Sequence, residues 1–105
     1  MIRFLRSPHG FETATDLSRR RSAGAARSLG QIDPEGNKQI LLKALNPVTS
    51  NYYLIRVFAA EGLARTKDTG VLKAIEQYRV EEKDSYVRQQ FDNASQAMRA
   101  NGVKP

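Results

Sequence analysis

The chain of 105 residues contains no cysteine and no tryptophan, and it has a single histidine. The absence of cysteine excludes disulfide bonds, thiolate zinc sites, iron–sulfur clusters and a cysteine nucleophile. Because His9 is the only imidazole, a zinc or iron site would depend mostly on carboxylates, which is unusual for these metals. We therefore expect no metal and no cofactor, and we interpret His9, between Pro8 and Gly10, as an exposed loop residue.

Long apolar runs are also absent. The longest are short, such as Ile40–Leu42, whereas a helix that spans a bilayer needs about 20 apolar residues. Hydrophobic residues make up 40% of the chain and charged residues 27%, which is ordinary for a folded globular protein. We expect one domain without membrane insertion, in the cytoplasm.

Motifs that carry catalysis are missing as well. The sequence has no Gly-rich phosphate loop, no Gly-x-Ser-x-Gly and no His-Glu-x-x-His. The acidic pair Glu81-Glu82 falls in a polar connector, where a solvated turn is a simpler interpretation than paired catalytic carboxylates. The sequence therefore predicts no enzymatic activity and no small-molecule substrate.

Negative charge is scarce near the N-terminus. The chain carries a net charge of +6, and residues 1–30 hold six arginines against two carboxylates. The rest of the chain, from residue 31 onward, holds 11 basic and nine acidic side chains, so it is nearly balanced. The basic excess is thus a feature of the first third of the chain, where Arg19, Arg20 and Arg21 are consecutive and Arg27 follows.

Apolar residues recur at the spacing of α-helices, and no window alternates long enough to predict a β-strand. Residues 1–15 lack this periodicity and contain Pro8 and Gly10, which predicts an extended or poorly ordered N-terminal arm. Asp16, Asp68 and Asp84 are good helix N-caps, and Gly30 stands where a helix commonly stops. We expect five helices, over approximately residues 16–29, 40–45, 52–66, 69–80 and 85–100.

The predicted helices repeat along the chain. Ala25–Gly30 aligns with Ala59–Ala64, and at an offset shorter by two positions Arg56 falls on Arg88. This second offset also aligns two apolar faces, Ile55, Ala59, Gly62 and Thr66 with Val87, Phe91, Ala94 and Met98. A period in the low thirties with one helix pair per unit is typical of α-solenoids.

The segment Ile55–Ala64, followed by Asp68 and Val71-Leu72, resembles the HEAT repeat of short bacterial type. The resemblance covers about residues 16–100. It implies an all-α protein, an α-solenoid of about two and a half HEAT-like helix pairs with a terminal capping helix. The domain organisation would then be an arm over residues 1–15 and a HEAT-like repeat domain over residues 16–105.

A HEAT-like stack implies a non-enzymatic protein–protein interaction module: an adaptor, a scaffold or a small subunit of a larger assembly. Its partner would be another protein, and an acidic surface on that protein would complement the basic residues. We predict that binding uses the basic segment and the grooved face formed by the second helices of the repeats. The predicted partner-binding residues are Arg19, Arg20, Arg21, Arg27, Lys38, Lys43, Lys73 and Gln77.

Three alternatives remain open at this point. The arginine cluster also fits a nucleic-acid-binding protein, although Arg19 and Arg21 diverge by about 200° around a helix and few aromatic residues lie between the arginines. The chain also fits a fragment of a longer solenoid. Bilin lyases and alkyl-purine DNA glycosylases have HEAT-like folds, but no catalytic motif of either kind is present.

Overall fold

The computed structural model describes the backbone of residues 8–50 and 52–105, and the side chains of residues 18, 20–50 and 52–105. Over these residues the chain forms five α-helices and no β-strand, which confirms the all-α class. The helices are α1 (Pro8–Ile32), α2 (Lys38–Ala44), α3 (Tyr53–Leu63), α4 (Thr69–Glu81) and α5 (Ser85–Ala100).

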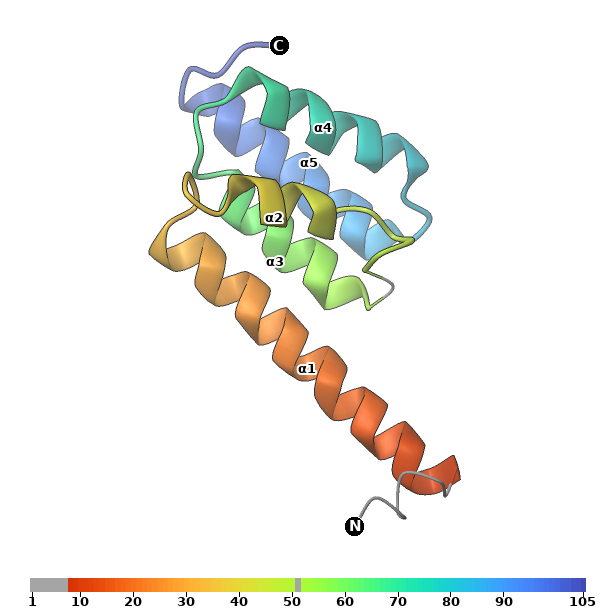
Figure 1. The fold of residues 1–105 in the computed structure, drawn as a ribbon. Coiled ribbons are helices and arrows are strands. Elements are labelled where there is room, and N and C mark those ends of the chain that lie inside the picture. The colour runs from red at the N-terminus through yellow and green to blue at the C-terminus, as the bar shows by residue number, and fades with distance from the viewer. Residues whose placement is uncertain (1–7, 51) are drawn as a thin grey trace.

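The helices form two layers (Figure 1). In the first layer α3 lies at the centre, with α1 packed on one side and α5 on the other, and these three helices run in the same direction. In the second layer α2 covers α3 and α4 covers α5, and both run in the opposite direction. α3 is therefore the helix with the most neighbours.

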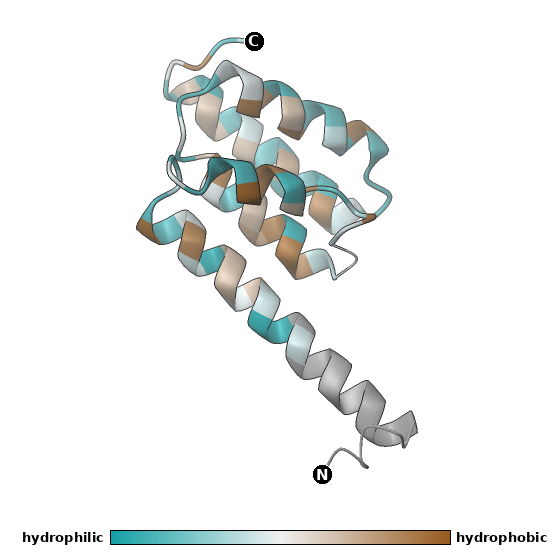
Figure 2. Cartoon of the chain, in the orientation of Figure 1, coloured by the Kyte–Doolittle hydropathy of each residue, from teal (hydrophilic) through white to brown (hydrophobic). Residues whose placement is uncertain are grey.

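The hydrophobic core lies where the two layers meet. Figure 2 shows hydrophobic residues recurring along each helix among hydrophilic ones, as expected of helices with one buried side. The largest apolar side chains of this core are completely buried: Leu41, Leu45, Leu63, Leu72, Ile75, Val87, Phe91 and Met98. Each such side chain stabilises the fold by about 1.5–3 kcal/mol relative to an exposed one.

α1 packs on α3 through residues with little or no side chain. Ala23, Ala26 and Gly30 are buried, and a Cβ atom added to Gly30 would lie only 2.6 Å from the Cα of Gly62. The backbones of the two helices thus touch at the two glycines. The expected stop at Gly30 is wrong, because α1 continues to Ile32 and the glycine serves this close approach instead.

The start of α1 also differs from the prediction. The arm expected over residues 1–15 is helical from Pro8 onward, whereas residues 1–7 lie outside the described part of the chain. Proline is well suited to the first position of a helix, since its φ angle is already helical and the missing N–H has no partner to lose there. With 25 residues against 11 in α3, α1 runs well past the end of its neighbour (Figure 1).

Two of the predicted N-caps are confirmed. The carboxylate of Asp68 accepts hydrogen bonds from the backbone N–H groups of Gly70 and Val71, and Asp84 caps α5 in the same way. Each such cap contributes about 1 kcal/mol to stability.

α5 ends at Asn101 and Gly102, as predicted. Gly102 has a φ of 93°, and its N–H donates a hydrogen bond to the carbonyl of Arg99. The N–H of Val103 donates to the carbonyl of Met98. This is a Schellman motif, in which glycine avoids the steric cost of the left-handed conformation.

The buried face of α5 is also confirmed, whereas that of α3 is broader than predicted. Val87, Phe91, Ala94 and Met98 are all buried in α5. In α3, Ala59 and Gly62 are buried as expected and Ile55 is only partly buried. The other buried residues of this helix are Arg56, Val57, Ala60 and Leu63. The reason is that α1, α2 and α5 cover three sides of this helix.

Candidate interaction surfaces

The basic segment of the sequence lies on α1. The side chains of Arg20, Arg21 and Arg27 are exposed, and the guanidinium of Arg27 lies 5.9 Å from the centre of the Phe58 ring. This is a cation–π distance, which stabilises Arg27 against α3 without neutralising its charge. The side chain of Arg19 lies outside the described part of the chain.

The second-layer residues predicted to bind a partner divide into two kinds. Lys43 on α2 and Lys73 and Gln77 on α4 are exposed, and their side chains make no hydrogen bond or ion pair with any described residue. Lys38 instead has a structural contact, because its Nζ lies 2.8 Å from Asp68 Oδ2 and 3.3 Å from Glu35 Oε1. This contact joins the first turn of α2 to the cap of α4.

The hydrogen bond between Lys38 and Asp68 shifts the pKa of both side chains. It is the main cause that raises the pKa of Lys38 and the main cause that lowers the pKa of Asp68. The N–H of Gly70 also lowers the pKa of Asp68, because a capping carboxylate is favoured in its charged form.

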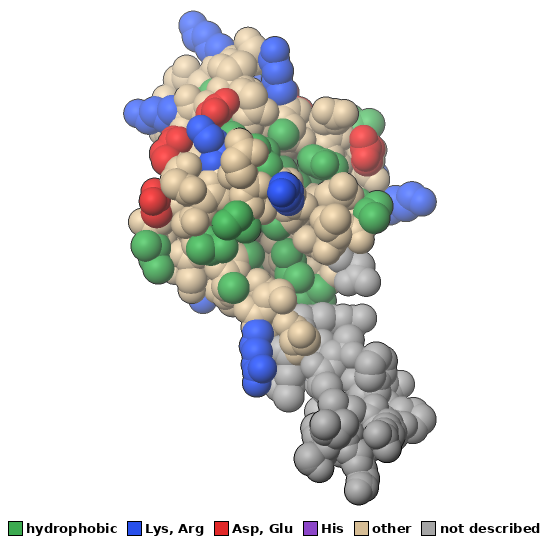
Figure 3. All heavy atoms as spheres, viewed as in Figure 1, with side chains coloured by type: hydrophobic (Ala, Val, Ile, Leu, Met, Phe, Trp, Pro, Cys, Tyr) green, Lys and Arg blue, Asp and Glu red, His purple; other side chains and the backbone are tan. Residues whose placement is uncertain are grey.

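Figure 3 views the molecule from the side of α2 and α4, where hydrophobic side chains gather between scattered lysines and arginines. Ile40 on α2 is 57% exposed and Val80 in the last turn of α4 is 78% exposed. Exposed aliphatic side chains beside lysines that lack carboxylate partners are a surface that another protein can cover. We call Ile40, Lys43, Lys73, Gln77 and Val80 the second-layer face.

A buried ion pair joins the first turn of α3 to the connector that precedes α5. The Nε and Nη2 atoms of Arg56 donate to the two oxygens of Glu82 at 2.8 and 2.9 Å, and Nη1 donates to the carbonyl of Ser50 at 2.7 Å. Arg56 is 6% exposed and Glu82 is 4% exposed. This bidentate geometry is the strongest that arginine makes with a carboxylate.

The interpretation of Glu81-Glu82 as a solvated turn is therefore wrong for Glu82, although Glu81 is exposed. Sequence reasoning missed this role because the partner of Glu82 lies 26 residues earlier. One signal was present: Glu82 follows Ser50 at the same offset that aligns Arg56 with Arg88 in the repeat.

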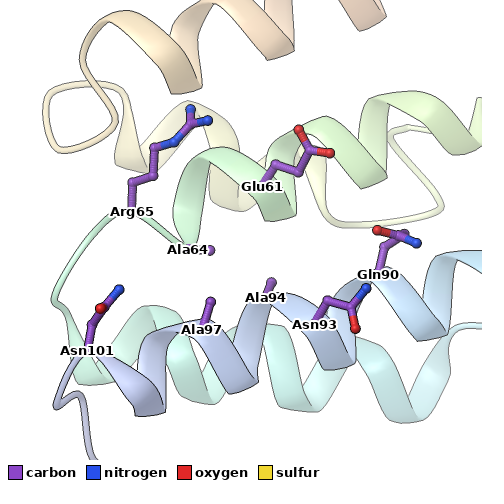
Figure 4. A pocket seen from close by; sticks show the side chains of 8 residues that line it. All are labelled: Glu61, Ala64, Arg65, Gln90, Asn93, Ala94, Ala97 and Asn101. Atoms are coloured by element: carbon purple, nitrogen blue, oxygen red, sulfur yellow. The ribbon is translucent and has the colours of Figure 1, made fainter.

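A groove runs between α3 and α5, with a volume of about 350 Å³. Figure 4 shows Ala94 and Ala97 between the amide side chains of α5, facing Ala64 at the end of α3. We call it the α3–α5 groove, and it is lined by Glu61, Ala64, Arg65, Gln90, Asn93, Ala94, Ala97 and Asn101. The sequence did not indicate it, because polar residues on a helix surface look the same whether they face solvent or a groove.

An aromatic cluster lies at the start of α3 and α5. The rings of Tyr53 and Tyr86 meet edge to face at 6.1 Å, and Tyr52 meets Tyr53 in the same way at 5.6 Å. Tyr53 is 40% exposed and Tyr86 51% exposed, so they are available for contact, whereas Tyr78 packs against the core. Packing against the core therefore accounts for Tyr78 but not for these two exposed rings.

The outer side of the α4–α5 pair carries two ion pairs. Arg79 Nε lies 2.9 Å from Asp92 Oδ1, and Arg99 Nε donates to Glu76 Oε2 at 3.2 Å. Arginines and carboxylates neutralise one another here. These two ion pairs link α4 to α5 on the surface of the molecule.

The described residues offer little basis for metal chemistry. In this part of the chain no group of three His, Cys, Asp or Glu side chains is placed to hold a metal ion. Within the same residues, no helix combines the length and the apolar character needed to cross a membrane.

Comparisons of the chain with protein-family models, with curated proteins and with solved structures found no match. The resemblance to HEAT repeats therefore rests on the sequence pattern.

Proposed function

We propose that this protein is a non-enzymatic protein–protein interaction module, built as a short HEAT-like stack that binds an acidic partner through its second-layer face and its basic first helix. The partner would lie over α2 and α4 and contact the exposed arginines of α1. Its carboxylates would neutralise the lysine charge that the described residues leave unpaired.

The observation that carries this proposal is the contrast between paired and unpaired cations. Lys38, Arg56, Arg79 and Arg99 each have a carboxylate partner. Lys43 and Lys73 have none among the described residues, although they flank exposed aliphatic side chains on the second-layer face. Cations beside apolar surface favour an acidic, partly apolar protein surface as the ligand.

The HEAT-like part of the proposal is supported by the close contact between α1 and α3. Gly30 and Gly62 meet there, separated by the offset that aligns Arg56 with Arg88. Ser50 and Glu82 are separated by the same interval and both accept hydrogen bonds from Arg56. Contacts between neighbouring units, such as that of Gly30 with Gly62 and that of Arg56 with Glu82, are what a solenoid requires.

The test is affinity capture of a partner from a native, nuclease-treated lysate at low and high salt. The wild-type chain is compared with the double charge reversal Lys43→Glu and Lys73→Glu. A matched control reverses two exposed lysines elsewhere, Lys83→Glu and Lys104→Glu, with the same change in net charge. We expect a defined protein that resists nuclease and is lost only with the first pair.

A partner retained equally by both double variants would contradict the proposed face.

A second candidate function, nucleic-acid binding through α1, is favoured by the absence of any acidic residue between Leu17 and Ile32 beside exposed Arg21 and Arg27. It predicts capture of nucleic acid that falls steeply with salt and disappears after nuclease treatment. Reversal of Arg21 and Arg27, rather than of the lysines, would then abolish binding.

A further inference from the structure

The α3–α5 groove exists because the residues that face each other across it are small. Ala64 comes from the end of α3, and Ala94 and Ala97 come from α5. A methyl group reaches too short a distance to fill the space between two helices, so a depression remains with an apolar floor. No residue of α2 or α4 lines this groove, which makes it separate from the second-layer face.

The rim of the groove consists of side chains that can hydrogen-bond to a ligand: three amides, a guanidinium and a carboxylate. Gln89 Nε2 donates to Asn93 Oδ1 at 3.1 Å, which occupies the oxygen of Asn93 and leaves its amide N–H groups for a ligand. Gln90 and Asn101 make no side-chain hydrogen bond with any described residue. The guanidinium of Arg65 donates to the carbonyl of Gly30 on α1 at 2.9 Å and points away from α5 (Figure 4).

The aromatic cluster continues the same surface. Tyr86, Gln90, Asn93 and Ala97 share one face of α5, since they are spaced by four, three and four residues. Tyr53 from α3 contacts Tyr86 at the beginning of this row. Along α5, the exposed ring of Tyr86, with Tyr53 beside it, is thus followed by two amide side chains and an alanine.

From Tyr86 to Asn101 the row is about 22 Å long at the rise of an α-helix. A polyproline II segment rises about 3.1 Å per residue, so about seven residues would cover it. Such a segment has no internal hydrogen bonds, and its carbonyl groups point outward to accept from donors such as these amides. Proline rings also pack well on exposed aromatic side chains.

We propose that the α3–α5 groove binds an extended, proline-containing polypeptide segment of a partner protein. Tyr53 and Tyr86 contact its proline rings, Gln90, Asn93 and Asn101 donate to its carbonyl groups, and the alanine floor receives a small side chain. Glu61, the one carboxylate of the rim, favours a basic residue on the segment.

Two other occupants fit the groove less well. A helical peptide needs a wide apolar trough, whereas this groove has polar rims on both sides of a narrow alanine floor. A nucleic-acid strand needs cations along its backbone, whereas the rim has one arginine against one glutamate.

The test uses the full chain and a phage-displayed library of random linear peptides of about ten residues. Enriched sequences are synthesised with a fluorescent label, and their affinity is measured by fluorescence polarisation. Ala97→Leu fills the floor and Asn93→Ala removes donors, at two exposed positions where the fold tolerates change. Ala100→Leu and Gln96→Ala are matched controls, because these α5 residues are also exposed but do not line the groove.

We expect peptides enriched in proline, whose affinity falls by about tenfold or more in the groove variants and stays unchanged in the controls. The charge reversals at Lys43 and Lys73 should also leave peptide affinity unchanged, which separates this proposal from the proposed function.

Absence of any enriched peptide would overturn the proposal. So would a helix-forming consensus, or affinity that is equal in Ala97→Leu and Ala100→Leu. Binding of a labelled oligothymidine that is lost in Tyr53→Ala and Tyr86→Ala, without any peptide binding, would assign the aromatic cluster to nucleic acid instead.

Discussion

α3 packs against two helices that run parallel to it, α1 and α5, and the residues that make the two contacts differ. At the first, Gly30 and Gly62 bring two backbones together. At the second, the buried pair of Arg56 and Glu82 ties α3 to the connector before α5, and a groove remains between the helices. The repeat offset that carries Gly30 onto Gly62 carries Gly62 onto Ala94, which lines that groove.

This difference shows how a repeated pattern yields two kinds of interface. A glycine pair permits backbone contact and closes the gap between helices. Alanines keep the helix axes farther apart. There the ion pair of Arg56 and Glu82 provides a polar link between α3 and the connector before α5. The tight interface is suited to stability alone, whereas the wider one also offers a surface for a ligand.

Breaking the polar link should have the largest effect. In Glu82→Ala, Arg56 remains buried without a counter-ion, which costs about 3–5 kcal/mol in free energy of unfolding. Chemical denaturation followed by circular dichroism measures this loss. Arg88→Ala is the matched control, because Arg88 occupies the equivalent repeat position but is exposed, and a change within about 0.5 kcal/mol is expected.

The double variant Arg56→Met and Glu82→Leu sharpens the same comparison. Removing both charges together leaves no unpaired ion, so it should be less destabilising than Glu82→Ala alone. Equal losses in the single and double variants would mean that the unpaired charge of Arg56 is not what destabilises Glu82→Ala.

Adding a side chain where Gly30 and Gly62 meet should have the next largest effect on stability. In Gly62→Ala the new Cβ would lie 2.6 Å from the Cα of Gly30, so the helices must separate, at a cost of about 1–3 kcal/mol. The same denaturation experiment applies. Gly24→Ala on α1 meets no atom within 4 Å, and we expect it to stabilise by about 0.5–1 kcal/mol, since alanine is the better helix former.

The ion pairs on the exterior of α4 and α5 should matter less than the buried one. A double-mutant cycle on Arg99→Ala and Glu76→Ala should give a coupling energy of about 0.2–1 kcal/mol, because both side chains are partly exposed to solvent. The coupling should decline in high salt. A value close to that of the buried pair would contradict the distinction between interior and exterior links.

The smallest effect concerns pH. The lowered pKa of Asp68 means that its charged form favours the folded state, so this contribution is present above the unfolded pKa of about 4 and is lost as the pH falls through the folded value. Between pH 7 and 3, wild-type stability should therefore decline slightly more than that of Asp68→Asn. Glu81→Gln, at an exposed residue without an ion pair among the described ones, should follow the wild type.

Sequence reasoning succeeded where the cause is local. Asp68 and Asp84 cap helices within three residues of themselves, and the buried face of α5 follows from its own periodicity. It failed where the cause lies elsewhere in the chain. The burial of Glu82 depends on Arg56, and the close approach of α1 to α3 at Gly30 depends on Gly62.

The candidate surfaces follow the same division. Periodicity places Gln90 and Asn93 on one side of α5, but only the packing of α3 beside it turns that side into a groove. The lysines of the second layer were predicted as a group, yet Lys38 alone has carboxylates within reach, because the cap of α4 lies next to it. Pairing between distant residues cannot be read from spacing alone.

The C-terminal segment closes the α4–α5 pair at its open end. Val103 is buried with Met98 in the core, and the hydroxyl of Thr69 donates to the carbonyl of Lys104 at 2.8 Å. A short connector joins α4 and α5 at the other end, so the two helices form a hairpin that is held at both ends. Most of its contacts join residues that are near one another in the sequence. Such contacts form quickly, so we expect this hairpin to assemble first and α1 to dock last, although α1 leaves the ribosome first.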